Sequence, residues 1–70
     1  MERFLRYSLE HDRAIRVILM HPDGKIRQVN AVVEAMEGDQ VRLYIIRPPQ
    51  RLTLPIRDLL SAANAAGDEG

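Results

Sequence analysis

Apolar and polar residues follow two different periods along the chain, and the change of period separates a helix from a strand. Phe4, Leu5 and Leu9 fall on one stripe of a helix. Their spacing predicts a short amphipathic helix over residues 2–12, which must dock on an apolar surface because so short a helix is barely stable alone. Over residues 14–20 the period becomes two, which predicts a β-strand with apolar side chains on both faces.

Three further strands are predicted by the same alternation, at residues 25–36, 41–46 and 51–54. Turn-forming residues lie between the four strands, at residues 21–24, 37–40 and 47–50. Gly24 supplies the positive φ that closes the first hairpin. Pro48 and Pro49 remove two backbone donors and end the third strand. The apolar pattern of residues 25–36 changes phase along its length, which predicts a bulge near Gln28.

The last part of the chain completes a recognisable order of elements. Residues 56–60 have the spacing of a single helical turn, and residues 61–63 are predicted to form a short fifth strand. A helix, four strands in hairpins, a one-turn helix and a last strand follow the order of a small SH3-like or Sm-like barrel, whose closure removes exposed strand edges. We therefore expect a mainly β fold, a five-stranded barrel with an N-terminal α-helix. It would form one domain over residues 1–63, followed by a flexible acidic tail at residues 64–70.

The composition excludes several classes of protein. With 70 residues, the chain is long enough for only one hydrophobic core. It has no cysteine, which excludes disulfides, thiol catalysis and cysteine zinc sites. The longest uncharged apolar run, residues 17–20, is far shorter than the roughly 20 residues of a membrane-spanning helix. Because the N-terminus also lacks the apolar core of a signal peptide, we expect no contact with a membrane and a location in the cytoplasm.

Motifs for catalysis and for metal binding are missing from the sequence. It contains no Ser-His-Asp or Cys-His arrangement, no catalytic carboxylate pair and no glycine-rich phosphate loop. Neither His11 nor His21 is accompanied by the further spaced donors that a zinc site requires. We therefore expect a protein that is not an enzyme and that uses no metal and no cofactor.

The charge is distributed unevenly, although the formal net charge is zero. The window from residue 40 to residue 57 holds four arginines and no acidic residue. Alternation places Arg42 and Tyr44 on the outer face of the third strand, and Arg51 on the outer face of the fourth strand beside it. Arginine binds phosphate with two parallel hydrogen bonds, and an aromatic ring or a guanidinium plane can stack on a base. The predicted ligand-binding residues are Arg42, Tyr44, Arg47, Arg51 and Arg57.

The pattern leaves other interpretations open. An outward arginine face is also compatible with a solvated surface, on which the side-chain stems cover apolar atoms. Arg16 and Arg27 are expected to face each other across the first hairpin and to pair with Glu34 or with solvent. Three apolar residues would form a seam for homo-oligomerisation unless the helix covers them: Ile18, Met20 and Ile46.

Four stretches of the chain carry a family resemblance: LRYSLEHDRAIRV at 5–17, DGKIRQV at 23–29, VRLY at 41–44 and LPIRDLLSA at 54–62. In chain order, they resemble four parts of the WYL domain: its opening helix and first strand, its first hairpin, the Trp-Tyr-Leu triplet after which it is named, and its closing segment. This domain is a bacterial Sm-like barrel usually attached to a DNA-binding helix-turn-helix. Of the triplet only Leu43 is kept, with Val41 and Arg42 in place of Trp and Tyr. The resemblance implies a transcription-regulating sensor, free-standing or excised because no helix-turn-helix is present, that recognises its ligand through a basic, aromatic face.

The leading interpretation is a non-catalytic regulatory module that binds a nucleotide or single-stranded nucleic acid through its arginine and tyrosine face. The alternative is a protein-interaction or homo-oligomerisation module that uses its edge strands and binds no nucleic acid. An Sm-type RNA ring is a third interpretation, which the turns at 37–40 and 47–50 do not favour because they lack a recognisable Sm RNA-loop signature. Salt separates the first two interpretations, since phosphate binding weakens steeply with salt and an apolar interface does not.

Overall fold

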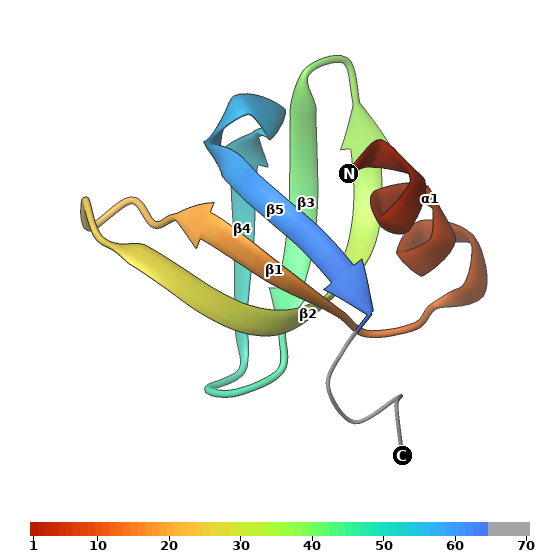
Figure 1. Cartoon of the computed structure of the whole chain (residues 1–70), viewed down its shortest axis with the longest axis horizontal. Coiled ribbons are helices and arrows are strands. Elements are labelled where there is room, and N and C mark those ends of the chain that lie inside the picture. The colour runs from red at the N-terminus through yellow and green to blue at the C-terminus, as the bar shows by residue number, and fades with distance from the viewer. Residues whose placement is uncertain (65–70) are drawn as a thin grey trace.

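The computed structural model describes residues 1–64, which form one helix and a five-stranded sheet (Figure 1). The elements are α1 (Glu2–His11), β1 (Ile15–Met20), β2 (Ile26–Glu37), β3 (Gln40–Ile45), β4 (Gln50–Pro55), the 3₁₀ turn η1 (Ile56–Asp58) and β5 (Leu59–Asn64). All neighbouring strands are antiparallel, in the order β4-β3-β2-β1-β5. The predicted mainly β fold is therefore confirmed, with its N-terminal helix and its short turn before the last strand. The predicted tail at residues 64–70 lies outside the described residues except for Asn64, which ends β5.

The helix α1 is held at its C-terminal end by a buried serine. Asp12 follows α1 in the left-handed conformation (φ 55°) and caps it. The Ser8 hydroxyl donates a hydrogen bond to the Arg13 carbonyl oxygen (2.6 Å) and accepts one from the backbone N–H of Val33 (2.9 Å). Ser8 is fully buried. One hydroxyl group thus joins the end of the helix to the middle of β2.

The long strand β2 is shared between two neighbours. Residues 26–31 pair with β1, and residues 31–37 pair with β3. The register with β1 is unbroken through Gln28, so the predicted bulge at that position is wrong. The irregularity lies instead between Val33 and Ala35, where β2 carries one residue more than β3. The apolar pattern changes phase ahead of this point because Ile26 is 62% exposed, whereas Ala31 and Val33 are buried in the core.

The hydrophobic core lies between α1 and one face of the sheet. Residues of β1 alternate as predicted, with Ile15, Val17 and Leu19 completely buried. Leu5 of α1 is buried in the same cluster. Ile18 and Met20 point to the opposite face and stay half-buried, so the helix does not cover them. The other buried apolar residues are Ala31, Val33, Val41, Leu43, Ile45, Leu54 and Leu59.

Candidate functional site

Two of the predicted ligand-binding arginines are held together by one glutamate. The guanidinium of Arg51 donates two hydrogen bonds to the Glu34 carboxylate, from Nε to Oε1 (2.9 Å) and from Nη2 to Oε2 (3.2 Å). Arg42 Nε lies 3.5 Å from Glu34 Oε1. The side chain of Glu34 is only 26% exposed, whereas those of the two arginines are more than half exposed. The Glu34 carboxylate therefore neutralises much of the charge that the sequence assigns to this face.

Strand register explains why these side chains meet. Tyr44 of β3 is directly opposite Arg51 of β4, and the Arg51 guanidinium carbon lies 5.2 Å from the centre of the Tyr44 ring. Arg42 is opposite Ala35, next to the bulge of β2. Because Glu34 is the extra residue of that bulge, its side chain reaches the face of Arg42 and Arg51. Arg16 and Arg27 do not face each other as expected, because Arg16 is opposite Asn30 and Arg27 is opposite Leu19. Neither pairs with Glu34 within residues 1–64, and Arg27 pairs with Asp23 instead.

The pH dependence of stability tests the Glu34 cluster. The hydrogen bond from Arg51 lowers the pKa of Glu34 below its ordinary 4.5, and the charges of Arg51 and Arg42 act in the same direction. Because the folded-state pKa is depressed, the stabilisation is complete above the unfolded-state pKa and is lost as the pH falls through the folded-state value. We expect the stability difference between wild type and Glu34→Gln to be constant at neutral pH and to shrink in acid.

Urea unfolding of the two proteins between about pH 7 and pH 2 measures this difference. The pKa of Asp23 is also lowered, chiefly by its hydrogen bond from Arg27. That group titrates in both proteins, so its effect cancels in the comparison. A stability difference that persists unchanged to the lowest pH would show that the Glu34 carboxylate forms no stabilising ion pair.

The other two predicted arginines lie away from this cluster. Arg47 follows β3 in the loop that leads to β4, and Arg57 lies in η1. Arg57 is not among the residues that line four hollows on the surface of residues 1–64. The five predicted residues consequently form no single site, since Arg42, Tyr44 and Arg51 meet around Glu34, Arg47 lies in a separate groove and Arg57 lies apart from both.

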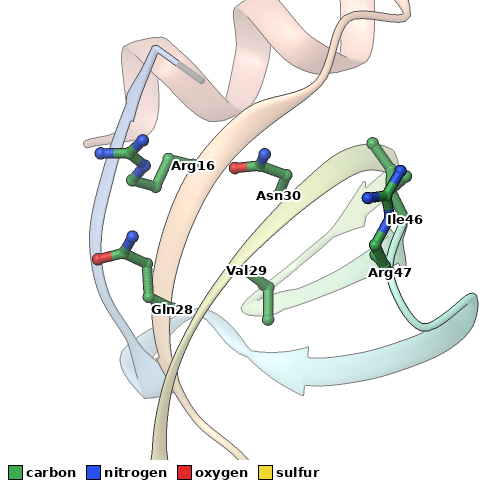
Figure 2. Close-up of a pocket in the computed structure, with 6 residues that line it drawn as sticks. All are labelled: Arg16, Gln28, Val29, Asn30, Ile46 and Arg47. Carbon is green, nitrogen blue, oxygen red and sulfur yellow. The ribbon is translucent and has the colours of Figure 1, made fainter. Parts of the chain in front are cut away.

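Arg47 shares its groove with an arginine that sequence reasoning did not select. This groove, about 380 Å³ in volume, is lined by Arg16, Gln28, Val29, Asn30, Ile46 and Arg47. Figure 2 shows the residues of β1 and β2 on one side and those of the β3–β4 loop on the other. A backbone hydrogen bond from Ile46 N to Asn30 O (3.0 Å) fixes the loop against β2.

The groove is the least neutralised basic region of the sheet's outer face. Its lining includes no acidic side chain. Within residues 1–64, neither Arg16 nor Arg47 forms an ion pair. The amides of Gln28 and Asn30 add uncharged donors and acceptors. Two guanidinium groups with free donors can bind a phosphate or a carboxylate group.

The sequence contained one signal for this groove. Alternation along β1 places Arg16 on the face opposite the core, which is the face of Asn30, its partner in the β1–β2 register. The link to Arg47 comes from the loop after β3, and no local pattern predicts where that loop lies. The groove can be predicted only when the registers of β2 with β1 and of β2 with β3 are both known, because its lining comes from β1, β2 and the loop after β3.

Two kinds of feature are absent from the part of the chain that the structure describes. No group of three or more histidine, aspartate or glutamate side chains is arranged to hold a metal ion within residues 1–64. No helix in the same range is long and apolar enough to cross a membrane. Comparison of the chain with models of protein families, with curated proteins and with solved structures finds no significant match.

Proposed function

We propose that the protein is a non-catalytic regulatory module that binds a nucleotide or single-stranded nucleic acid on the outer face of its sheet. The observation that carries the proposal is the groove between β1, β2 and the β3–β4 loop, whose lining includes no acidic residue and two arginines that form no ion pair within residues 1–64. Arg16 and Arg47 bind the phosphate in this proposal. They replace Arg42 and Arg51 in that role, since those two already bind Glu34.

The cluster around Glu34 has a different role in the proposal. The Tyr44 ring has the Arg51 guanidinium over one of its faces, so that face is already occupied. Two hydrogen bonds to Glu34 fix the orientation of this guanidinium. A guanidinium fixed in this way is itself a plane on which a base can stack. Arg51 and Tyr44 then support an unstacked base, while the phosphate charge is met at Arg16 and Arg47.

The overall architecture supports the same proposal. The order of one helix, four strands, a 3₁₀ turn and a fifth strand is the order that the resemblance to the WYL domain implies. Only η1 separates the end of β4 from the start of β5, which brings the two edge strands of the sheet close together at that end. A backbone hydrogen bond from Ile56 N to Asp39 O (2.7 Å) ties η1 to the β2–β3 turn. We therefore also propose that the sheet curls into an SH3/Sm-like barrel.

Salt dependence tests the proposed function. A fluorescently labelled ten-nucleotide oligothymidylate should bind at low salt and raise the fluorescence anisotropy. If Arg16 and Arg47 each replace one counterion, the logarithm of the affinity falls with that of the salt concentration at a slope of about −1.4. The affinity then drops roughly 25-fold between about 20 and 200 mM salt. The proposal is overturned for nucleic acid and nucleotide alike if neither the oligonucleotide nor nucleoside monophosphates bind at low salt.

A second candidate function has its own observation. Two large apolar side chains are strongly exposed on the sheet, Ile26 at 62% and Leu60 at 50%. Strands β4 and β5 are the edges of the sheet order, so each has one side without a strand partner among the described strands. These features favour a homo-oligomer or another protein contact. Such an interface would persist in high salt, whereas the binding proposed above would not.

A further inference from the structure

A second cavity lies next to the groove of Arg16 and Arg47 and shares three of its lining residues. It has a volume of about 580 Å³, within the range of about 300–1,000 Å³ that small-molecule sites occupy. The shared residues are Gln28, Val29 and Arg47. Its remaining lining consists of His21, Ile26, Arg27, Ile45, Pro48 and Gln50. The side chain of Arg47 therefore stands at the junction of the two hollows.

The walls of this cavity differ in chemistry from those of the groove. Ile26, Val29, Ile45 and Pro48 supply apolar surface, and Gln28 and Gln50 supply amide donors and acceptors. Apolar walls with a few polar groups are typical of sites that hold a flat organic ring. The groove, by contrast, is lined mainly by charged and amide side chains.

Strand pairing leaves backbone groups available at the same place. Residues 26–29 of β2 pair with β1 on one side, whereas pairing with β3 begins only at Ala31. On the β3 side of β2, the last backbone hydrogen bond is the one from Ile46 N to Asn30 O. Between residue 26 and residue 29, the other side of β2 therefore has no strand partner among the described strands. Free backbone donors and acceptors of a strand can bind the polar edge of a base.

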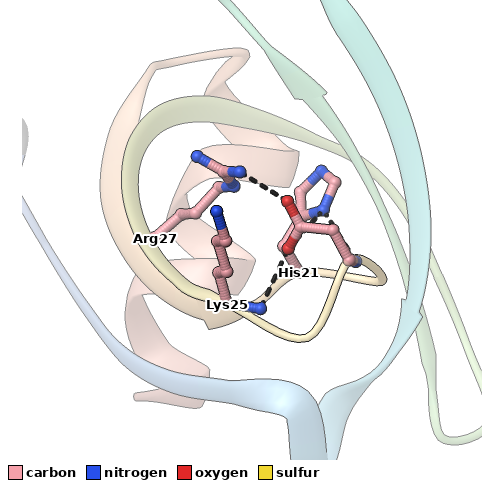
Figure 3. Close-up of polar contacts among 4 residues, drawn as sticks. His21, Lys25 and Arg27 are labelled. Carbon is pink, nitrogen blue, oxygen red and sulfur yellow. Dashed lines mark hydrogen bonds and ion pairs between the residues drawn. The ribbon is translucent and has the colours of Figure 1, made fainter.

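The first hairpin supplies His21 and Arg27 to the lining of the cavity, and Asp23 contacts both of them (Figure 3). The Asp23 carboxylate binds the Arg27 guanidinium and accepts a hydrogen bond from the Lys25 backbone N–H (2.9 Å). Nδ1 of His21 accepts a hydrogen bond from the Asp23 backbone N–H (3.1 Å) and lies 3.2 Å from Asp23 Oδ1. His21 and Arg27 are thus both held by Asp23, whereas Arg47 forms no ion pair within residues 1–64.

We propose that the two hollows together bind one free nucleoside 5′-monophosphate, with the phosphate between Arg16 and Arg47 and the base in the cavity lined by Ile26, Val29 and Gln50. This inference rests on the proposed function and narrows its ligand from any phosphate-bearing base to a single mononucleotide. The arrangement matches that ligand because its charge lies at one end and its flat ring with polar edges lies at the other. A phosphate without a base fills only the basic groove.

Binding of four nucleoside 5′-monophosphates, ribose 5-phosphate and the ten-nucleotide oligothymidylate tests the inference. Isothermal titration at low salt should give at least one of the monophosphates an affinity about 10- to 100-fold above that of ribose 5-phosphate. Backbone amide resonances of residues 26–29 should shift with the monophosphate and stay in place with ribose 5-phosphate. Arg47→Ala should weaken the binding of both compounds.

Two glutamines provide a matched pair of variants for the same experiment. Gln50 and Gln40 are both exposed and lie at opposite ends of the β3–β4 ladder. Only Gln50 lines the cavity. Gln50→Ala should weaken monophosphate binding about 3- to 10-fold and leave ribose 5-phosphate binding unchanged. Gln40→Ala should affect neither compound, and a proton–nitrogen correlation spectrum shows whether each variant is folded.

The outcomes separate this inference from the proposed function. If all four monophosphates bind no better than ribose 5-phosphate, the proposal that the cavity binds a base is refuted, and the proposal that the groove binds phosphate is retained. If the oligonucleotide binds and the monophosphates do not, the proposal of a mononucleotide ligand is refuted, and the proposal of nucleic-acid binding is retained. If no probe binds, both proposals fail together.

Discussion

Ser8→Ala is expected to destabilise the protein by about 2–4 kcal/mol. The hydroxyl of this residue has two hydrogen-bond partners, the Arg13 carbonyl and the Val33 N–H. The side chain is completely buried, so water cannot replace the lost oxygen without the helix moving. The bond from the Val33 N–H is buried, and a buried donor left without a partner costs about 1–3 kcal/mol. Loss of the partly buried bond to the Arg13 carbonyl adds to this cost. A domain of this size has a total stability of only about 3.5–10 kcal/mol, so the loss would be a large part of it.

The size of this effect follows from the position of Val33 in the sheet. Pairing of β2 with β1 ends at Ala31, so the β1 side of β2 beyond that point has no strand partner among the described strands. The helix lies on that side, and the Ser8 hydroxyl takes the place of a strand carbonyl. Ser8 also fixes the end of α1, because its own carbonyl oxygen accepts the capping hydrogen bond from Asp12.

Ser61→Ala is the matched control for this experiment. Ser61 is exposed on β5, and no hydrogen bond of its side chain is found within residues 1–64. The same chemical change there should alter stability by less than about 0.5 kcal/mol. Urea or thermal unfolding followed by circular dichroism measures both variants. If Ser8→Ala proves as harmless as Ser61→Ala, the hydroxyl does not hold the helix to β2.

Local patterns were sufficient to predict the elements of this fold. Alternation identified β1 and its inward residues, and Gly24 and Gly38 both have the positive φ that their turns require, 87° and 58°. The same reasoning misplaced the irregularity of β2, because it counted the exposed Ile26 with the core residues and took the change of phase after it for a bulge. The bulge depends on the register between β2 and β3, and that register is a property of two strands rather than of one.

The candidate site could be predicted only in part, for the same physical reason. Alternation and hairpin pairing place Arg42, Tyr44 and Arg51 on one face, and the structure has them there. Counting charges within one window of sequence missed Glu34, which is 17 residues from Arg51 and binds it through the bulge. Arg47 lines the same groove as Arg16 only because a loop bonds to β2 at Asn30. To predict which charges balance each other on a folded surface, one must therefore know the strand registers.

Simultaneous substitution of Arg16 and Arg47 by alanine is expected to reduce binding of the ten-nucleotide oligothymidylate at low salt by about 100-fold or more. Each hydrogen bond to a charged group is worth about 1.5–3 kcal/mol, so the loss of two corresponds to at least that factor. Neither guanidinium has an ion-pair partner among residues 1–64, so both are free to bind phosphate. Fluorescence anisotropy at several salt concentrations measures the affinity and its slope.

Arg42→Ala combined with Arg51→Ala is the matched comparison for that double variant. Both pairs of substitutions lower the net charge by the same amount, so the long-range attraction of the oligonucleotide changes equally. They differ in direct contacts, because the Glu34 carboxylate already binds Arg42 and Arg51. We expect this second variant to lose about tenfold in affinity, because a base no longer stacks on Arg51, and to keep the salt slope of the wild type, because its phosphate contacts remain. If its salt slope falls as far as that of the first variant, the phosphate is bound at the Glu34 cluster, and the groove of Arg16 and Arg47 is not the site.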